Sequence, residues 1–332
     1  MNSTAPSDQV TAPITGRLLP VDALRGIAVI LMVQQHLLAW LWDAPKVPFP
    51  HLVHGYPLSM GLNLLGNLAA PLFIMLAGTG AGLFLERPGA RGRTLVMRGA
   101  VTLLLGIALN LLAPYWFAPG TWYVLHLLGL CLMLAPLLGK TPSPALLPLC
   151  LCVFAASAVD QSCNGAPSSL PDLRLNDASL PGGIARLALS EGHFPVLPWM
   201  SFFILGMVAH RFARTRERAR VFVLAGGLVA AGATLALLYR QGHAFATYGP
   251  LYRAFVFAPY FFPPHTPLML VLAGAALAGA AGATALPEGG NGIALRALAR
   301  FGRAPLSLLF VHVILFNSLA HSLGLYRSFP IM

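Results

Sequence analysis

The sequence predicts an all-α integral membrane protein, a bundle of about nine transmembrane helices with the N-terminus in the cytoplasm. Charged residues are only 9% of the 332 residues, against about 25% in soluble domains, and apolar residues make up 57%. This composition excludes a cytosolic enzyme, a nucleic-acid-binding domain and a disordered chain. Apolar stretches close to the ~20 residues that span a bilayer occur at 24–42, 59–85, 95–117, 120–139, 142–159, 194–210, 220–239, 265–287 and 304–325.

The limits of these spans follow from charges and helix-breaking residues. Arginine-rich segments at 86–98 and 211–220 separate two pairs of neighbouring spans. The uncharged stretch between residues 99 and 139 is too long for one helix, and Pro114, Pro119 and Gly120 divide it into two. The span at 142–159 has the weakest pattern, because three prolines lie near its start.

The placement of basic residues orients the bundle. With a cytoplasmic N-terminus, 15 of the 21 Lys and Arg residues fall on the inner side, as the positive-inside rule requires. All five Trp and all eight Tyr residues fall at outer ends or in outer segments. This one-sided aromatic surface would suit a carbohydrate-binding mouth, and a structural belt at the interface would explain it equally well. We expect a disordered cytoplasmic tail over 1–16, a membrane domain over 17–325 and a short tail over 326–332.

The cysteines and histidines give no metal pattern. Four cysteines lack metal-ligand spacing and are interpreted as thiols, not as a disulfide framework. Histidine spacings include no helical pair of the HExxH kind, so no metal is expected.

The first span carries ionisable residues at membrane depth, where such residues are costly and mark functional sites. Arg25 and His36 are 11 residues apart, which is three helical turns plus roughly 20°, so both lie on one face about 16 Å apart along the axis. Asp22 is one turn before Arg25 and can pair with it. The pattern predicts a cation at the cytoplasmic mouth and an imidazole near the midplane. The alternative is a helix-end ion pair and a histidine bonded to a neighbouring helix.

Other polar residues in apolar runs are weaker candidates. Asn63 and Asn67 lie one turn apart in the second span and could fix the tautomer of an imidazole, or simply bond two helices together. His126 and His312 each lie in an apolar run. A single histidine of this kind is more often a bonded core residue than a catalyst.

Residues 17–36, RLLPVDALRGIAVILMVQQH, resemble the opening of bacterial membrane proteins with a heparan-alpha-glucosaminide N-acetyltransferase catalytic domain. The similarity continues in order along the chain, to about residue 320. It includes 69–78 (AAPLFIMLAG), Arg98-Gly99 before an apolar run, 124–129 (VLHLLG), 194–199 (FPVLPW) with Gly206-Met207, and 301–308 (FGRAPLSL).

The resemblance implies acyl transfer in a bacterial cytoplasmic membrane. The Arg25–His36 spacing is similar to that of the first helix of acyltransferase-3 proteins, in the same transmembrane acyltransferase superfamily, where the histidine acts in acyl transfer. In the lysosomal heparan enzyme the implicated histidine precedes the second span, where this chain has His51 and His54. Asn67 stands where that enzyme has an aspartate.

The leading hypothesis is an integral-membrane acetyltransferase with acetyl-CoA as the acyl donor. The donor phosphates would meet Arg25, held by Asp22, together with Arg93 and Arg98. His36, with an ordinary pKa near 6.5, would act as general base, or as the site of an acetyl-histidine intermediate.

The remaining site residues would serve the acceptor, a sugar amine or hydroxyl that enters from the outer side. Asn63 or Asn67 would orient the ring of His36 or hold the carbonyl oxygen, and His54 is the competing catalytic histidine. His126, Trp199 and His312 are the candidates for acceptor binding.

Two other function classes compete with the acetyltransferase. A transporter or flippase for a small anion or a lipid-linked sugar would show paired inverted repeats and broken helices, which the sequence does not display convincingly. A purely structural subunit would leave Arg25 and His36 unexplained. Lipid is the expected surrounding, nucleic acid is not an expected partner, and the sequence leaves the oligomeric state open.

Overall fold

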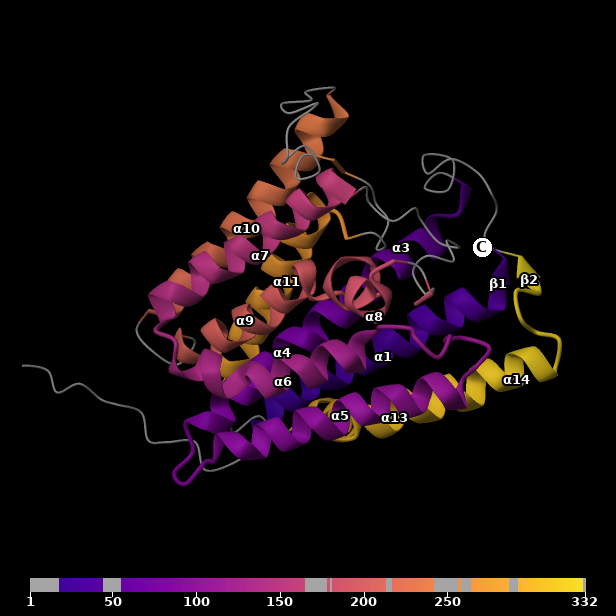
Figure 1. Cartoon of the computed structure of the whole chain (residues 1–332), viewed down its shortest axis with the longest axis horizontal. Helices are drawn as coiled ribbons and strands as arrows, with labels where there is room; N and C mark the ends of the chain where they lie inside the picture. The colour runs from indigo at the N-terminus through magenta and orange to yellow at the C-terminus, as the bar shows by residue number, and fades with distance from the viewer. Residues whose placement is uncertain are drawn as a thin grey trace, which may run out of the picture.

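The computed structural model describes residues 18–43, 55–164, 178–179, 181–212, 217–241, 256–257, 264–286 and 292–330. The tail predicted over 1–16 lies outside these residues, as do His51 and His54. The described chain is almost entirely helical, which confirms the predicted all-α class (Figure 1). Its helices are α1 (Leu19–Leu41), α3 (Pro57–Gly66), α4 (Ala69–Leu85), α5 (Gly92–Leu112), α6 (Val124–Lys140), α7 (Ser143–Asn164), α8 (Gly183–Arg186), η2 (Leu187–Glu191), α9 (Val196–Phe212), α10 (Arg218–Arg240), α11 (Thr266–Ala285), α12 (Ile293–Arg303), α13 (Pro305–Val311), η4 (His312–Phe316) and α14 (Asn317–Ser322).

Among the described residues, seven helical segments are long and apolar enough to cross a membrane. An eighth arises if the bent pair of α8–η2 and α9, which meet at 55°, counts as one span. The short apolar helix α6 has 17 residues and lies where a further span was predicted. Each of the nine predicted spans therefore corresponds to a helix, and the count of nine requires both the bent pair and α6.

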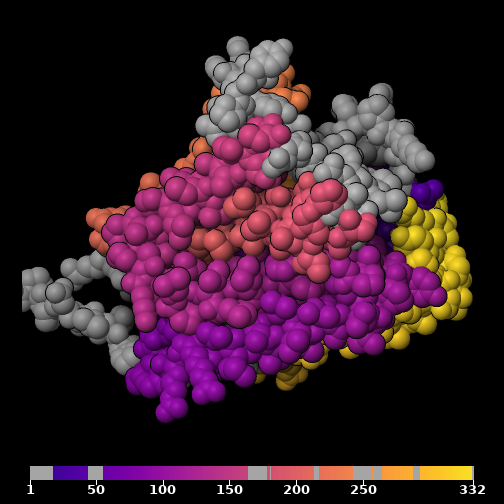
Figure 2. Space-filling model, in the orientation of Figure 1, coloured from indigo at the N-terminus to yellow at the C-terminus, as the bar shows by residue number. Residues whose placement is uncertain are grey.

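The interior of the bundle lies where α4, α9 and α11 meet (Figure 1). Phe203 and Met207 of α9, Met75 of α4 and Met269 of α11 are fully buried there. A side chain on Gly78 of α4 would overlap the carbonyl of Phe203, so a glycine lets the two backbones touch. In the space-filling view α5 forms the lower face, and the C-terminal segment covers one end of the molecule (Figure 2).

Helix α12 was not predicted, because its 11 residues include three arginines and were assigned to an inner loop. It packs closely along α1 through two glycines. A Cβ on Gly302 would overlap the carbonyl oxygen of Asp22, and one on Gly26 would overlap that of Leu298. This crossing brings Arg303 to 3.6 Å from the carboxylate of Asp22.

The last span is not a regular α-helix. A π-helical segment, η4, interrupts it between α13 and α14, and such segments often occur at functional sites. Beyond α14, β2 (Phe329–Pro330) pairs in parallel with β1 (Trp42–Asp43). The backbone N–H of Arg327 donates to the carbonyl of Trp40 at 2.8 Å, so the predicted short tail is joined to the end of α1.

The close contact between α1 and α12 should contribute to the free energy of unfolding. Gly302→Ala should lower the free energy of unfolding by about 1–3 kcal/mol, because the added methyl overlaps backbone that cannot withdraw. Gly282→Ala in α11, where an added Cβ meets nothing within 4 Å, should raise it by about 0.5–1 kcal/mol. Thermal unfolding of both purified variants in the same detergent measures the difference, and equal melting temperatures would refute the close packing.

Candidate active site

His36 lies in the half of α1 that leads toward β1, and it is half-buried. Its Nδ1 atom is 2.7 Å from Nε2 of His312, the first residue of η4. The two rings have centroids 5.0 Å apart and planes inclined by only 13°. The histidine pair therefore joins the first span directly to the last.

Two tryptophans enclose the ring of His36. Trp40, one turn further along α1, is fully buried and stacks on it, with centroids 5.3 Å apart and planes inclined by 21°. Trp116 meets the ring edge-on at 5.9 Å and packs on Trp40 at 5.4 Å. These contacts fix the plane of the imidazole without supplying a charge.

His312 is 2% exposed and its second nitrogen is also bonded. Nδ1 lies 2.7 Å from the carbonyl oxygen of Leu308, one turn earlier. Both nitrogens of His312 thus have partners. In contrast, Nε2 of His36 has no hydrogen bond within the described residues, and it is not among the fully buried polar atoms that lack one.

The predicted asparagines lie beside α1 but bond elsewhere. Asn63 accepts a hydrogen bond from the side chain of Gln35, the residue before His36. Asn67 is buried at the end of α3, where its backbone N–H donates to the carbonyl of Asn63. In the described structure the ring of His36 is held by His312, while Asn63 holds its neighbour.

The end of α1 predicted to face the cytoplasm carries a buried carboxylate between two cations. Asp22 is 6% exposed, and it bonds Arg25 at 2.8 Å, which confirms the predicted pair. Arg303 approaches the other carboxylate oxygen at 3.6 Å. Arg303 is not among the predicted site residues, because the sequence pattern does not predict its helix.

Further cations gather at the same end of the bundle, around the last turns of α4. The guanidinium of Arg98 lies over the ring of Phe84, 5.0 Å from its centroid, and Arg93 is exposed at the start of α5. His210 pairs with Glu86 at 3.0 Å. The guanidinium of Arg25 lies beside Gly80 and that of Arg98 over Phe84, so both arginines adjoin the last turns of α4.

The other predicted acceptor-site residues serve the core. His126 is buried, and its Nδ1 accepts the backbone N–H of Tyr123 at 3.4 Å, so it caps the start of its own helix. Trp199 is fully buried against Phe194 and Phe202. It belongs to the main core cluster, not to the cluster around Trp40.

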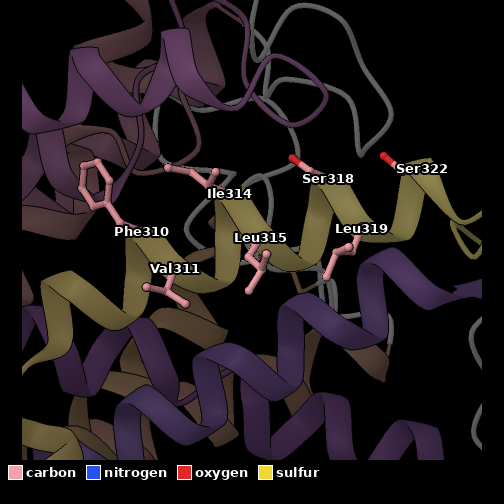
Figure 3. Close-up of a pocket in the computed structure, with 7 residues that line it drawn as sticks. All are labelled: Phe310, Val311, Ile314, Leu315, Ser318, Leu319 and Ser322. Carbon is pink, nitrogen blue, oxygen red and sulfur yellow. The ribbon is translucent and has the colours of Figure 1, made fainter.

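A shallow groove of about 500 Å³ runs along the last span (Figure 3). It has apolar walls and two hydroxyl groups, and no titratable side chain lines it. Its lining residues are Phe310, Val311, Ile314, Leu315, Ser318, Leu319 and Ser322. The groove therefore offers an apolar surface without a titratable side chain.

In the part of the chain that the structure describes, no group of three or more His, Cys, Asp or Glu side chains could hold a metal ion. The arrangement places an imidazole with one nitrogen not bonded by the described residues between aromatic rings, in the same helix as the Arg25–Asp22 ion pair.

Comparison with known proteins identifies the family. The family model described as Heparan-alpha-glucosaminide N-acetyltransferase, catalytic, matches residues 17–248. A search of curated proteins finds no match. The matched region runs from α1 to the end of α10, and so contains Arg25, Arg98 and His36 but not His312. Because the match covers well over half of the chain, the protein belongs to the heparan-alpha-glucosaminide N-acetyltransferase catalytic-domain family, a family of transmembrane acetyltransferases.

Proposed function

We propose that this protein transfers an acetyl group from cytoplasmic acetyl-CoA to an amine or hydroxyl, carried by a sugar, at the outer side of a bacterial cytoplasmic membrane. One observation carries the proposal. The open nitrogen of His36 lies in the same helix as the Arg25–Asp22 pair, 11 residues further along. That separation corresponds to about 16 Å, enough to bring an acyl group from the inner surface to the membrane centre.

In the proposed reaction, the amine nitrogen or hydroxyl oxygen of the acceptor attacks the thioester carbonyl, and Nε2 of His36 removes the acceptor proton. The carbon–sulfur bond of the donor breaks and the new acetyl bond forms. The departing thiolate takes the proton back from His36, so the products are the acetylated acceptor and coenzyme A. A histidine suits both transfers because its ordinary pKa lies near neutrality.

The donor is proposed to bind at the cationic surface. Arg25 is oriented by the buried carboxylate of Asp22, and the exposed side chains of Arg93 and Arg98 can approach phosphate groups. Arginine suits this role because its planar fork binds phosphate oxygens in pairs. Arg303 shares Asp22 with Arg25, and so supports the same surface.

The acceptor is proposed to approach His36 from the opposite end, where Trp116 is half-buried beside the ring. Aromatic faces bind the apolar faces of sugars, which supports a glycan acceptor. Asn63, through Gln35, would steady this part of α1, and Asn67 would hold the carbonyl oxygen. His126 and Trp199 would act on the acceptor only indirectly, through the core that they support.

The catalytic role of His36 predicts a large loss of turnover on substitution. His36→Ala should lower kcat by about 10²–10⁴-fold, the usual contribution of a general base, while acetyl-CoA binding persists. His36→Gln keeps hydrogen bonding but cannot carry the proton, so it should fail almost as badly. Turnover is measured as coenzyme A release by the purified protein. Near-normal activity of His36→Gln, together with an inactive His54→Gln, would assign the catalytic role to His54 instead.

The donor site predicts a binding defect at the inner surface. Replacing both Arg93 and Arg98 with Ala should weaken acetyl-CoA binding at least about tenfold, because two charge-assisted contacts to phosphate are lost. Arg240→Ala, at the far end of α10, is the matched control and should bind normally. Calorimetric titration with acetyl-CoA gives both affinities, and an unchanged double variant would remove these arginines from the donor site.

The orientation predicts which thiols an impermeant maleimide reaches in intact cells. Cys163 is exposed near the end of α7 and should be labelled from outside. Pro88→Cys, in the exposed turn between α4 and α5, should be labelled only after permeabilisation, when measured in a chain whose Cys152 and Cys163 are replaced by Ser. The reverse pattern would place the N-terminus outside.

A further inference from the structure

We infer that His312 is a positioning residue: it holds His36 in the tautomer that keeps Nε2 as the basic nitrogen. This inference rests on the proposed function, because it explains how His36 is prepared for proton removal. It assigns a role in catalysis to the last span, beyond the region that the family model matches.

The hydrogen-bond chain determines the tautomers. The carbonyl oxygen of Leu308 can only accept, so Nδ1 of His312 must carry a proton. A neutral imidazole has a single N–H, and Nε2 of His312 is therefore an acceptor. The proton in the 2.7 Å contact then belongs to Nδ1 of His36. By the same rule, Nε2 of His36 carries a lone pair.

The neutral form is the appropriate starting state, because an unpaired charge is costly at this depth of a membrane. When His36 takes up the acceptor proton, its Nδ1–H becomes a donor from a charged ring, and hydrogen bonds of that kind are stronger than neutral ones. His312 therefore stabilises the imidazolium as well as the resting tautomer. Its own position is secured by Leu308, one turn earlier in the last span.

Among the described residues around His36, His312 is the one that determines its tautomer. Two further aromatic rings in the described residues contact His36: Trp40 stacks on it, and Trp116 meets it edge-on. Asn63 bonds Gln35 instead. His312 is the only described side chain that bonds Nδ1 of His36, so without it either nitrogen could carry the proton.

Two substitutions separate ring packing from hydrogen bonding. His312→Phe keeps an aromatic ring against His36 but removes the acceptor nitrogen. It should lower kcat by about 10- to 100-fold, as loss of an orienting partner typically does, and leave the KM for acetyl-CoA unchanged. His312→Gln offers a side-chain oxygen to the Nδ1 proton and should retain most of the activity. A role in packing alone would give the opposite order.

A spectroscopic measurement tests the tautomer without reference to activity. In intact protein labelled with ¹⁵N-histidine, His36 is assigned as the pair of signals absent from His36→Gln. Its nitrogen shifts should report a protonated Nδ1 and a bare Nε2 in the native chain and in His312→Gln, and a mixture in His312→Phe. Unchanged shifts and turnover in His312→Phe, with His36→Ala inactive, would overturn this inference and leave the proposed function standing. Full activity of His36→Ala would instead overturn the proposed catalytic role, while the shifts would still decide the tautomer.

Discussion

The hydrogen bond between His36 and His312 is the interaction on which the site depends. It joins residues 276 positions apart and places the first span beside the last. A membrane interior leaves few polar partners for an imidazole, so each nitrogen that is bonded determines the state of the next. From the Leu308 carbonyl to the open Nε2 of His36, the chain of bonds has one consistent arrangement of protons when both rings are neutral.

Hydropathy predicted the helices well, because spanning a bilayer imposes a length and a composition that can be counted along the chain. It failed at α12, where arginines on one side of a short helix resemble an ordinary inner loop. The bend between η2 and α9 was also missed. Both features depend on the helices that the segment packs against. For α12 that helix is α1, which is far away in the sequence.

The candidate site was predictable where its residues share a helix. Asp22 and Arg25 pair as their spacing indicates, since three residues form nearly one turn. The partner of His36 was not predictable, because Asn63 and His312 were equally isolated polar residues and nothing in the sequence orders spans in space. In the structure, Asn63 bonds the side chain of Gln35, and His312 bonds the ring of His36. The sequence alone predicts only a role in acceptor binding for His312, because it does not show this contact.

The contact between the two ends of the chain also has a consequence for assembly. Helices enter a membrane singly and pack afterwards, so α1 must wait for the last span before His36 meets its partner. Until then Nδ1 of His36 lacks the partner that it has in the complete bundle, and its proton can lie on either nitrogen. The order of synthesis therefore sets the point at which the ring of His36 acquires a single tautomer. The parallel pairing of β1 with β2 then secures the end of α1, because residues 329–330 follow the last span in the chain.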